Sequence, residues 1–381
     1  MKHYWIILLA LIATSCKKDE PEPDPTMKRV VVVYMVAENN LSSFSASDLY
    51  EMRQGMKNIP DSCQLVVYYD NASTNQMPQI LTLDSKQGEK VLYQYRNDPI
   101  STDSAAMQQT LGIIRQKCPA RSYGLVLWSH ASGWIPPQPR KTFGVDNGKN
   151  LSAGSASAIG TEMEISTLAN VLKKSGMQWD YIFSDACFMQ GIEVAYELRD
   201  AVKWCIGSPA EIPGDGAPYT EIMADLFREP DEVWHIAENY YKHYIHGSGV
   251  VISAIKTDEL EALADATAPL LKNMPDYPST TDVQRYNPSN TQWKPYYFDM
   301  SSAMYQWCTE ADYQTWRQAL ERAVPYRFAT DFWLSAMPGY AVYPDVEDPE
   351  HIAAVSMYIP VAGHAMNEYY EGTAWWKRMR K

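Results

Sequence analysis

Two hydrophobic patterns alternate along residues 27–275. Short runs that are apolar throughout are typical of strands buried on both faces of a sheet, and apolar residues three to four positions apart predict helices. The predicted strands are 29–35, 64–69, 123–129, 179–184 and 203–207. The predicted helices are 46–56, 103–117, 166–175 and a helix from Met189 onward. Strands that alternate with helices predict an α/β fold with a mainly parallel sheet covered on both faces.

The pattern changes outside this core. Residues 79–95 hold two alternating runs, which predict a hairpin at one edge of the sheet. After Asn273 the composition shifts to Pro, Asn, Tyr and Trp, and no strand-helix rhythm returns until about Asp312. We therefore predict a main domain at 27–275 and a C-terminal region at 276–381 packed on it. The remaining predicted elements are a strand at 250–254, a helix at 258–272, a strand at 353–360 and a closing helix at 369–379.

The N-terminus predicts export. A short basic start precedes an apolar run, 4–13, which is too short to span a bilayer as a helix, and small residues then lead to Cys16. We favour a bacterial lipoprotein with a signal peptide at 1–15, a lipid on Cys16 and an acidic, Pro-rich tether at 16–26. A plain cleaved signal with an incidental cysteine is the alternative. The lysines and acids after Cys16 resemble the surface-export signal of Bacteroidetes lipoproteins, which implies the outer membrane and the cell surface.

Charge and cysteine content narrow the function classes. The formal net charge of −13 argues against nucleic acid as a partner and against adsorption to anionic lipid, so only the lipid anchor would contact the membrane. The odd number of cysteines after Cys16 has no regular spacing and implies at least one free thiol. These cysteines are Cys63, Cys118, Cys187, Cys205 and Cys308.

Two predicted strands end in reactive groups. One runs into "WSHASGW" with His130, and the other into "SDACFM" with Cys187. Reactive groups collect at the carboxyl ends of parallel strands, and the single helix predicted between these two strands makes them neighbours. A thiol and an imidazole there form a nucleophile and its acid/base partner, and the helix after Cys187 would lower its pKa. Alternatively, Cys187 is a small buried hydrophobe and His130 an ordinary surface histidine.

Other candidates weigh less. His243 and His246 have helical spacing, with His235 nearby, but no third ligand accompanies them, so a helix face is favoured over a metal site. The many Trp and Tyr residues are scattered, which gives little support to a glycan-binding groove. Asp146-Asn147-Gly148 is most simply a turn. No metal site is therefore expected.

Several segments together resemble the clostripain family of cysteine peptidases. They are "VVYMVAENNL" (32–41), "WSHASGW" (128–134), "SDACFM" (184–189), "EIPGDGAPYTEIM" (211–223) and "AVSMYIP" (354–360). The resemblance implies a caspase-like three-layer α/β/α sandwich with Cys187 as nucleophile and His130 as general acid/base. It also implies an oxyanion hole formed by the backbone N–H groups of Ala131 and Cys187. Ala131 stands where the family usually has glycine, which matters if that backbone requires φ > 0.

The acids near Cys187 suggest a substrate pocket. Asp185 shares a strand face with Cys187, and Asp215 lies in a Pro-Gly-Asp-Gly turn after the next strand. An ordinary turn aspartate is equally consistent with the sequence around Asp215. The family resemblance favours a pocket formed by both acids for Arg or Lys.

Relatives mature by cleavage in the segment that corresponds to 136–162, where the basic residues are Arg140, Lys141 and Lys149. We predict Lys149 as the autoprocessing site. The resemblance implies no cofactor, although a calcium requirement in some relatives leaves calcium open. The expected protein is a cysteine endopeptidase that cleaves peptides or proteins after Arg or Lys through an acyl-enzyme. The alternative is a catalytically silent surface lipoprotein that binds peptides or glycans.

Overall fold

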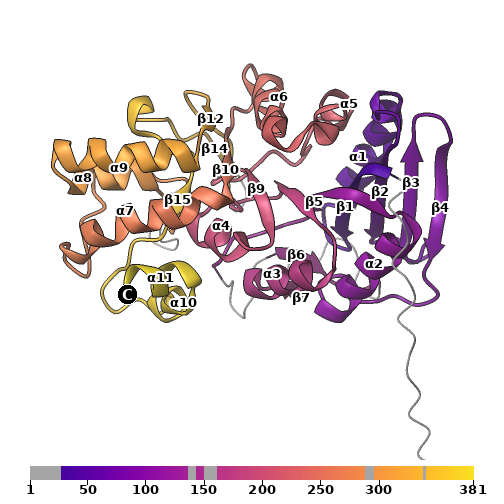
Figure 1. The fold of residues 1–381 in the computed structure, drawn as a ribbon, viewed down its shortest axis with the longest axis horizontal. Coiled ribbons are helices and arrows are strands. Elements are labelled where there is room, and N and C mark those ends of the chain that lie inside the picture. Colours follow the sequence, from indigo (N-terminus) through magenta and orange to yellow (C-terminus); the bar gives the residue numbers. More distant parts are fainter. Residues whose placement is uncertain (1–26, 136–142, 150–160, 288–295, 338–339) are drawn as a thin grey trace, which may run out of the picture.

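The structure, a computed structural model, describes residues 27–135, 143–149, 161–287, 296–337 and 340–381. Its centre is a nine-stranded sheet with the order β12-β10-β9-β8-β5-β1-β2-β3-β4 (Figure 1). The five central strands from β9 to β2 are parallel, and the strands at both edges are antiparallel. The predicted α/β class with a mainly parallel sheet is confirmed. The strands are β1 (Met27–Ala37), β2 (Cys63–Asn71), β3 (Gln79–Asp84), β4 (Gly88–Gln94), β5 (Ala120–Trp128), β8 (Trp179–Asp185), β9 (Val202–Gly207), β10 (Val251–Lys256) and β12 (Tyr326–Ala329).

Helices cover both faces of this sheet (Figure 1). Residues of β1 alternate between two apolar cores, with Val30, Val32 and Tyr34 in one and Val31 and Val33 in the other. Each buried side chain of this kind contributes about 1.5–3 kcal/mol relative to an exposed one, which explains why these strands are apolar throughout. The first core is covered by α2 (Ser104–Lys117), α3 (Ile165–Lys174) and α4 (Ile192–Leu198), and the second by α1 (Ser42–Gly55), α5 (Tyr219–Ile222) and α6 (His235–Tyr244).

Short two-stranded sheets lie outside the main sheet. The pairs are β6 (Phe143–Asp146) with β7 (Thr161–Met163), β11 (Phe298–Asp299) with β15 (Ser356–Met357), and β13 (Ser335–Met337) with β14 (Tyr340–Val342). The first of these pairs places residues 143–149 beside the carboxyl ends of β1 and β5, because the amide of Gly144 donates to the carbonyl of His130 at 2.9 Å.

The chain after residue 275 contributes to the main sheet. After α7 (Leu260–Lys272), this part of the chain includes α8 (Met300–Trp307), α9 (Glu310–Ala323) and the edge strand β12. The hydrophobic pattern showed no strand-helix rhythm before about Asp312, but α8 begins earlier, at Met300, with Asp299 as its N-cap. Helices α7 and α9 are joined by a hydrogen bond from Trp316 to Thr267 of 2.9 Å. The boundary near residue 275 stays a prediction.

The C-terminal elements are shorter than their hydrophobic pattern suggests. In place of the predicted strand at 353–360 the structure has only β15, preceded by Ala354 in the left-handed region at φ 52°. The predicted helix at 369–379 is divided into α10 (Met366–Gly372) and α11 (Ala374–Met379). The division occurs because the Thr373 hydroxyl accepts from the amide of Trp376 and caps a new helix.

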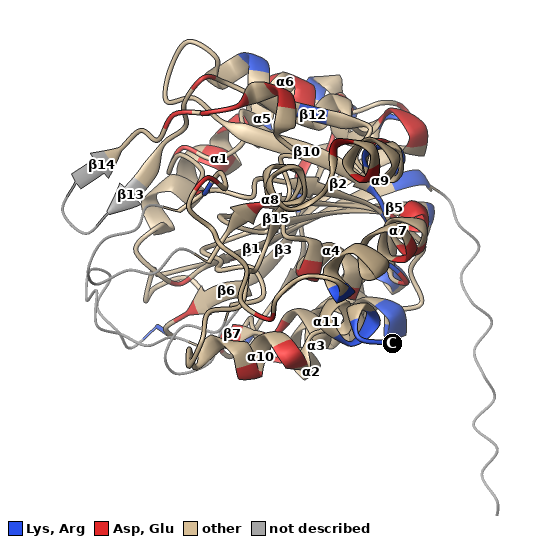
Figure 2. Ribbon diagram, turned by 90° about the vertical axis from the view of Figure 1, so that its left-hand side faces the viewer, with Lys and Arg blue, Asp and Glu red and all other residues tan. Residues whose placement is uncertain are grey.

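Charged residues are spread over the molecule. In Figure 2, Asp and Glu occur on helices of both layers, whereas Lys and Arg gather at α11 near the C-terminus. None of the helices in the described ranges has both the length and the apolar character that crossing a bilayer requires. Residues 1–26, with Cys16 and the predicted signal and tether, lie outside the described residues.

Candidate active site

The two predicted catalytic residues follow neighbouring parallel strands. Strand β5 ends at Trp128, just before His130, and β8 ends at Asp185, just before Cys187. Trp128 and Asp185 are paired in the register of these strands. The structure therefore brings His130 and Cys187 to the same carboxyl edge of the sheet, where parallel α/β folds place their reactive groups.

The loops that carry His130 and Cys187 contact each other. Gly133 has φ 60°, and a Cβ added there would lie 2.5 Å from the carbonyl oxygen of Phe188, so the approach requires glycine. Tyr297 spans both loops, since its ring stacks on Phe188 at a centroid distance of 4.2 Å and its hydroxyl donates to the carbonyl of Ser132 at 2.7 Å. These contacts hold the two loops in a fixed relation.

His130 is oriented by Asn40, in the loop after β1. The Nε2 atom of His130 lies 2.6 Å from Oδ1 of Asn40. Because an amide oxygen only accepts, this contact assigns the hydrogen to Nε2 and leaves the lone pair on Nδ1. Burial lowers the pKa of His130, so the ring is neutral at pH 7. A neutral, oriented imidazole is ready to accept a proton.

Cys187 has a thiol that is protonated at rest. The side chain is half-buried, and the amide of Ile212 donates to Sγ at 3.5 Å. Burial raises the pKa of Cys187 to about 12, and the nearby acids Glu211 and Asp185 add to this shift. The predicted lowering of this pKa by a helix N-terminus is wrong, because α4 begins only at Ile192.

The residue after Cys187 makes a sharp turn. Phe188 adopts φ 60°, a left-handed conformation that is rare for a bulky residue, and its amide donates to the carbonyl of Ala210 at 2.9 Å. Gln190 then donates from its side-chain amide to the carbonyls of Cys205 and Ser253 at 3.1 and 2.9 Å. Such strain persists only where surrounding contacts fix it, and it is concentrated at functional sites.

Ala131 does not need the conformational freedom of glycine. It is absent from the non-glycine residues with positive φ in the described chain, which are Ser62, Phe188 and Ala354. Ala131 faces Phe143 across an isolated antiparallel bridge. The alanine therefore fits its backbone without strain and keeps its N–H group.

Asp185 lies in a buried site. Its side chain is at the end of β8 and is 4% exposed. Oδ2 accepts hydrogen bonds from the Tyr219 hydroxyl at 2.7 Å and the Ala217 amide at 3.1 Å, whereas Oδ1 has no partner among the described residues. Burial raises the pKa of Asp185 to about 6, so the carboxylate is largely ionised at pH 7. A second buried acid, Asp48 of α1, accepts from the indole N–H of Trp128 at 2.6 Å.

Asp215 and Asp185 lie on opposite sides of one turn. The turn is closed by a 3.0 Å hydrogen bond from the amide of Gly216 to the carbonyl of Pro213. The inner side of Gly216 faces Asp185, since a Cβ there would lie 3.0 Å from its Oδ2. Asp215 is exposed and lines a cavity of about 530 Å³ together with Phe44 and Tyr244. The structure thus places the two predicted pocket acids near each other, with Asp185 covered.

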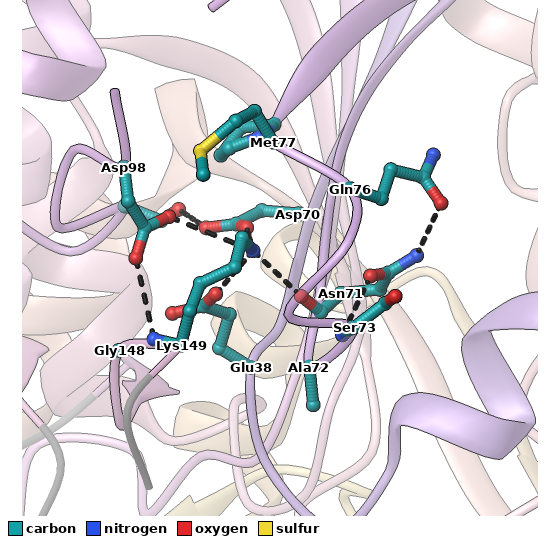
Figure 3. Close-up of polar contacts among 12 residues, drawn as sticks. Glu38, Asp70, Asn71, Ala72, Ser73, Gln76, Met77, Asp98, Gly148 and Lys149 are labelled. Atoms are coloured by element: carbon teal, nitrogen blue, oxygen red, sulfur yellow. Dashed lines mark hydrogen bonds and ion pairs between the residues drawn. The ribbon is translucent and has the colours of Figure 1, made fainter. Parts of the chain in front are cut away.

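Lys149 is buried in a cluster of acids at the ends of β1 and β2 (Figure 3). Its ammonium group forms an ion pair with Glu38 and bonds to Oδ1 of Asp70 at 2.9 Å and the carbonyl of Asn71 at 2.8 Å. Asp98 lies 3.5 Å away. Burial raises the pKa of Glu38 to about 8 and that of Asp70 to about 7. Cleavage after Lys149 therefore requires this side chain to leave the cluster.

The other predicted features are placed separately from the site. Arg140 and Lys141 lie outside the described residues. His235 contacts Glu238 at 3.0 Å and His243 contacts Glu221 at 3.1 Å, so the two imidazoles have different carboxylate partners. Among the described residues, the carboxyl oxygens that approach one another within 4.8 Å as a metal site would are those of Glu38, Asp70 and Asp98, which already surround the ammonium of Lys149.

Comparison with known families now identifies the chain. The model of the clostripain family matches residues 33–324, which include both strand ends and the acids around them. The chain belongs to the clostripain family. This clostripain-family protein is accordingly a cysteine peptidase with the caspase-like fold that its sequence motifs implied. No curated protein matches it.

Solved structures extend the similarity beyond the family match. An inactive zymogen C11 protease from Parabacteroides distasonis is 28% identical, with a TM-score of 0.80 over 93% of this chain and 98% of that one. A secreted C11 cysteine protease from Bacteroides thetaiotaomicron, in complex with an irreversible peptide inhibitor, is 30% identical, with a TM-score of 0.79 over 93% and 99%. A clostripain from Bacteroides thetaiotaomicron ATCC 29148 in complex with the peptide inhibitor BTN-VLTK-AOMK is 25% identical, with a TM-score of 0.52 over 60% and 98%.

Sequence reasoning missed three residues of this clostripain-family site. Asn40 lies within the quoted segment 32–41, but nothing in that segment indicates that it contacts His130. Tyr297 lies in the region without a clear pattern, and Asp48 lies on a helix face that its sequence does not mark as buried near Asp185. Each contact depends on how distant segments meet, so no local signal was available.

Proposed function

We propose that this peptidase is an endopeptidase that cleaves after Arg or Lys, with Cys187 as nucleophile and His130 as general acid/base. The observation that supports it most is the contact between the His130 and Cys187 loops at adjacent strand ends, through Gly133, Phe188 and Tyr297. A nucleophile held beside an oriented base is the arrangement that covalent catalysis requires.

The proposed reaction uses groups of this chain and one water. The proton of the Cys187 thiol moves to Nδ1 of His130 as Sγ attacks the scissile carbonyl carbon. The N–H groups of Ala131 and Cys187 stabilise the oxyanion, and the imidazolium then protonates the leaving amine. Water attacks the resulting acyl-enzyme with His130 as base, which releases the new carboxyl group and restores the thiol.

The resting pair is neutral rather than an ion pair. Because burial raises the pKa of Cys187 to about 12 and lowers the pKa of His130, the proton stays on sulfur until a substrate carbonyl is in place. A small alkylating agent should therefore react slowly, whereas a peptide that carries an electrophile should react fast. This differs from an enzyme with a preformed thiolate.

Asp185 and Asp215 are the proposed specificity residues. Asp185 is a buried carboxylate whose Oδ1 has no hydrogen-bond partner among the described residues, and a cationic side chain of the substrate would supply one. Substrates with apolar side chains would leave it unpaired, which costs free energy. The Bacteroides thetaiotaomicron clostripain with the inhibitor BTN-VLTK-AOMK, in which K stands for lysine, supports a preference of this kind.

The proposal also covers export and processing. The signal-like N-terminus and the relative described as secreted support an exported lipoprotein, with residues 1–15 removed, Cys16 lipidated and 16–26 as a tether to the outer membrane. Cys16→Ser should abolish incorporation of a labelled fatty acid. Chain cleavage after Lys149 stays part of the proposal, and mass spectrometry of the purified wild type against Lys149→Gln tests it directly.

A panel of otherwise identical fluorogenic peptides with Arg, Lys, Leu or Asp before the scissile bond tests the function. Wild-type protein should cleave the Arg and Lys peptides alone, and Cys187→Ala and His130→Ala should be inactive with nearly unchanged thermal midpoints. Cleavage by Cys187→Ala would overturn the mechanism. Binding without cleavage by the wild type would favour the alternative of a silent peptide-binding lipoprotein.

A further inference from the structure

Asp48 and Asp185 are two buried carboxyl groups that have no cationic partner in the part of the chain that the structure describes. Asp48 is 2% exposed and Asp185 is 4% exposed. Within the described ranges, no Lys, Arg or His nitrogen lies within 4.0 Å of either one. Buried acids are normally paired, because an isolated buried charge is costly. The buried acid Asp180, for comparison, is paired with both Arg29 and Lys203.

The two carboxyl groups converge on one point. A Cβ added to Gly216 would lie 3.0 and 3.2 Å from the two oxygens of Asp185 and 3.3 Å from Oδ2 of Asp48. These contacts are too tight for a Cβ, so glycine at 216, with φ 62°, lets the turn close over the two acids. Oδ1 of Asp185, one of the oxygens around this point, is buried without a hydrogen-bond partner.

The described residues around Asp48 supply hydrogen bonds but no positive charge. Trp128 donates to its Oδ2 from β5, and Asp185 faces it from β8. Among the described residues, the other titratable groups around the two acids are Cys187 after β8, Glu51 of α1, Asp215 of the covering turn, Tyr219 of α5, and Tyr240 and Tyr244 of α6. His243 lines the cavity outside the turn and pairs with Glu221.

We propose that Asp48 is a second specificity-determining acid, which forms with Asp185 a two-carboxyl pocket for the cationic side chain of the substrate and releases a proton when that cation binds. The inference rests on the proposed cleavage after Arg or Lys. Two carboxyl groups at one point match the fork of a guanidinium better than one does. They also explain why α1 carries a buried acid that accepts a hydrogen bond from Trp128 but has no cationic partner among the described residues.

The proton balance follows from the charges. Burial and the charge of Asp185 raise the pKa of Asp48 to about 9, so the empty pair at pH 7 holds one proton and one negative charge. An incoming guanidinium lowers the pKa of a neighbouring acid by about 1–3 units. Asp48 then gives its proton to solvent, and the bound site holds one cation and two carboxylates.

The covering turn controls access to the pair. Gly216 of this turn lies over both acids, and Asp215 on the outer side of the turn lines the cavity with Phe44. Gly214 and Gly216 flank Asp215, and the Tyr244 hydroxyl donates to the carbonyl of Gly216 at 2.6 Å, so entry to the pair requires this bond to break. A cation attracted by Asp215 would enter from this cavity and displace the turn.

Calorimetry with N-acetyl-arginine amide, whose guanidinium does not titrate between pH 6 and 9, tests the proposal in the Cys187→Ala protein. Affinity should rise at least tenfold from pH 6 to pH 9, and heats in buffers of different ionisation enthalpy at pH 7.5 should show a proton released on binding. This measurement of proton release is made with Asp48 unmutated. N-acetyl-citrulline amide, a neutral ligand of the same shape, should bind weakly at every pH.

Asp48→Asn in the same background should still bind the arginine ligand at pH 6 but lose the rise in affinity with pH. Asp299→Asn, a control at another buried acid, should keep that rise. Arginine binding without proton release, or the same rise in Asp48→Asn, would overturn the role of Asp48 and leave the proposed specificity intact. If arginine and citrulline ligands bind alike at every pH, the basic-residue specificity fails, and the role of Asp48 fails with it.

Discussion

Replacing Lys149 by methionine should destabilise the peptidase in a strongly pH-dependent way. The ammonium of Lys149 is the one cation in contact with Glu38, Asp70 and Asp98 within the part of the chain that the structure describes. Removing one partner of a buried ion pair costs about 3–5 kcal/mol when the remaining charges cannot be neutralised. At acid pH the carboxyl groups take up protons, and the loss of unfolding free energy falls to that of the missing hydrogen bonds, about 1 kcal/mol.

The sign of the pH dependence follows from the raised pKa values. Glu38 and Asp70 have folded pKa values of about 8 and 7, above those of the unfolded chain, so folding takes up protons and stability falls as pH rises from about 4 to 8. Lys149 lowers both pKa values, and its removal raises them further. The free energy of unfolding lost in Lys149→Met should therefore grow from pH 5 to pH 8.

Urea unfolding at pH 5 and pH 8 in the Cys187→Ala background, which excludes self-cleavage, measures this difference. Lys173→Met is the matched control, because the Lys173–Asp200 pair is exposed and should contribute less than about 1 kcal/mol at either pH. An equal loss of unfolding free energy in Lys149→Met at both pH values would contradict charge compensation by Lys149, as would a loss at pH 8 no larger than that of the control.

Three further substitutions test the active site. Asn40→Ala should lower kcat about 10- to 100-fold with little change in KM. Asn40→Asp should raise the pKa of His130 and move the acid limb of the pH profile of kcat/KM to higher pH. Unchanged kinetics in both variants would show that Asn40 does not position His130. Tyr297→Phe loses the bond to Ser132, worth about 1 kcal/mol, and should lower kcat/KM up to about fivefold, with wild-type activity as the contrary outcome. Asp185→Asn should lower kcat/KM for Arg peptides by about one to two powers of ten without slowing the labelling of Cys187 by iodoacetamide. An unchanged preference for Arg would show that the pocket acid is another residue.

The central part of the fold was predictable because its strands are buried on both faces. From Val30 to Ala37 strand β1 is apolar at every position, since alternate residues enter different cores, and such a run is recognisable without any partner. The short edge strand β12 has half-buried residues and gives no comparable signal. Helix α8 was missed because its region is rich in Pro, Asn and aromatic residues, which obscure the helical period.

The site was predictable only as far as strand ends determine it. The positions of His130 and Cys187 follow from topology, whereas the contact between Asn40 and His130 depends on the path of a loop. Lys149 shows the limit most clearly, because a lysine in a Gly- and Ser-rich segment suggests an exposed residue, yet it is buried among three acids. Charge compensation between distant segments cannot be inferred from local composition.

The most direct test of the account compares two alkylating agents on Cys187. Because the resting thiol is neutral, iodoacetamide should label Cys187 slowly near pH 7, whereas a peptidyl-arginine chloromethyl ketone should label it rapidly and His130→Ala should abolish the difference. Tryptic mapping by mass spectrometry identifies the modified cysteine among the five described thiols. Rapid labelling of Cys187 by the peptide reagent alone is the predicted result. Equally slow labelling of Cys187 by both reagents, or modification of another cysteine by the peptide reagent, would contradict a Cys187–His130 peptidase.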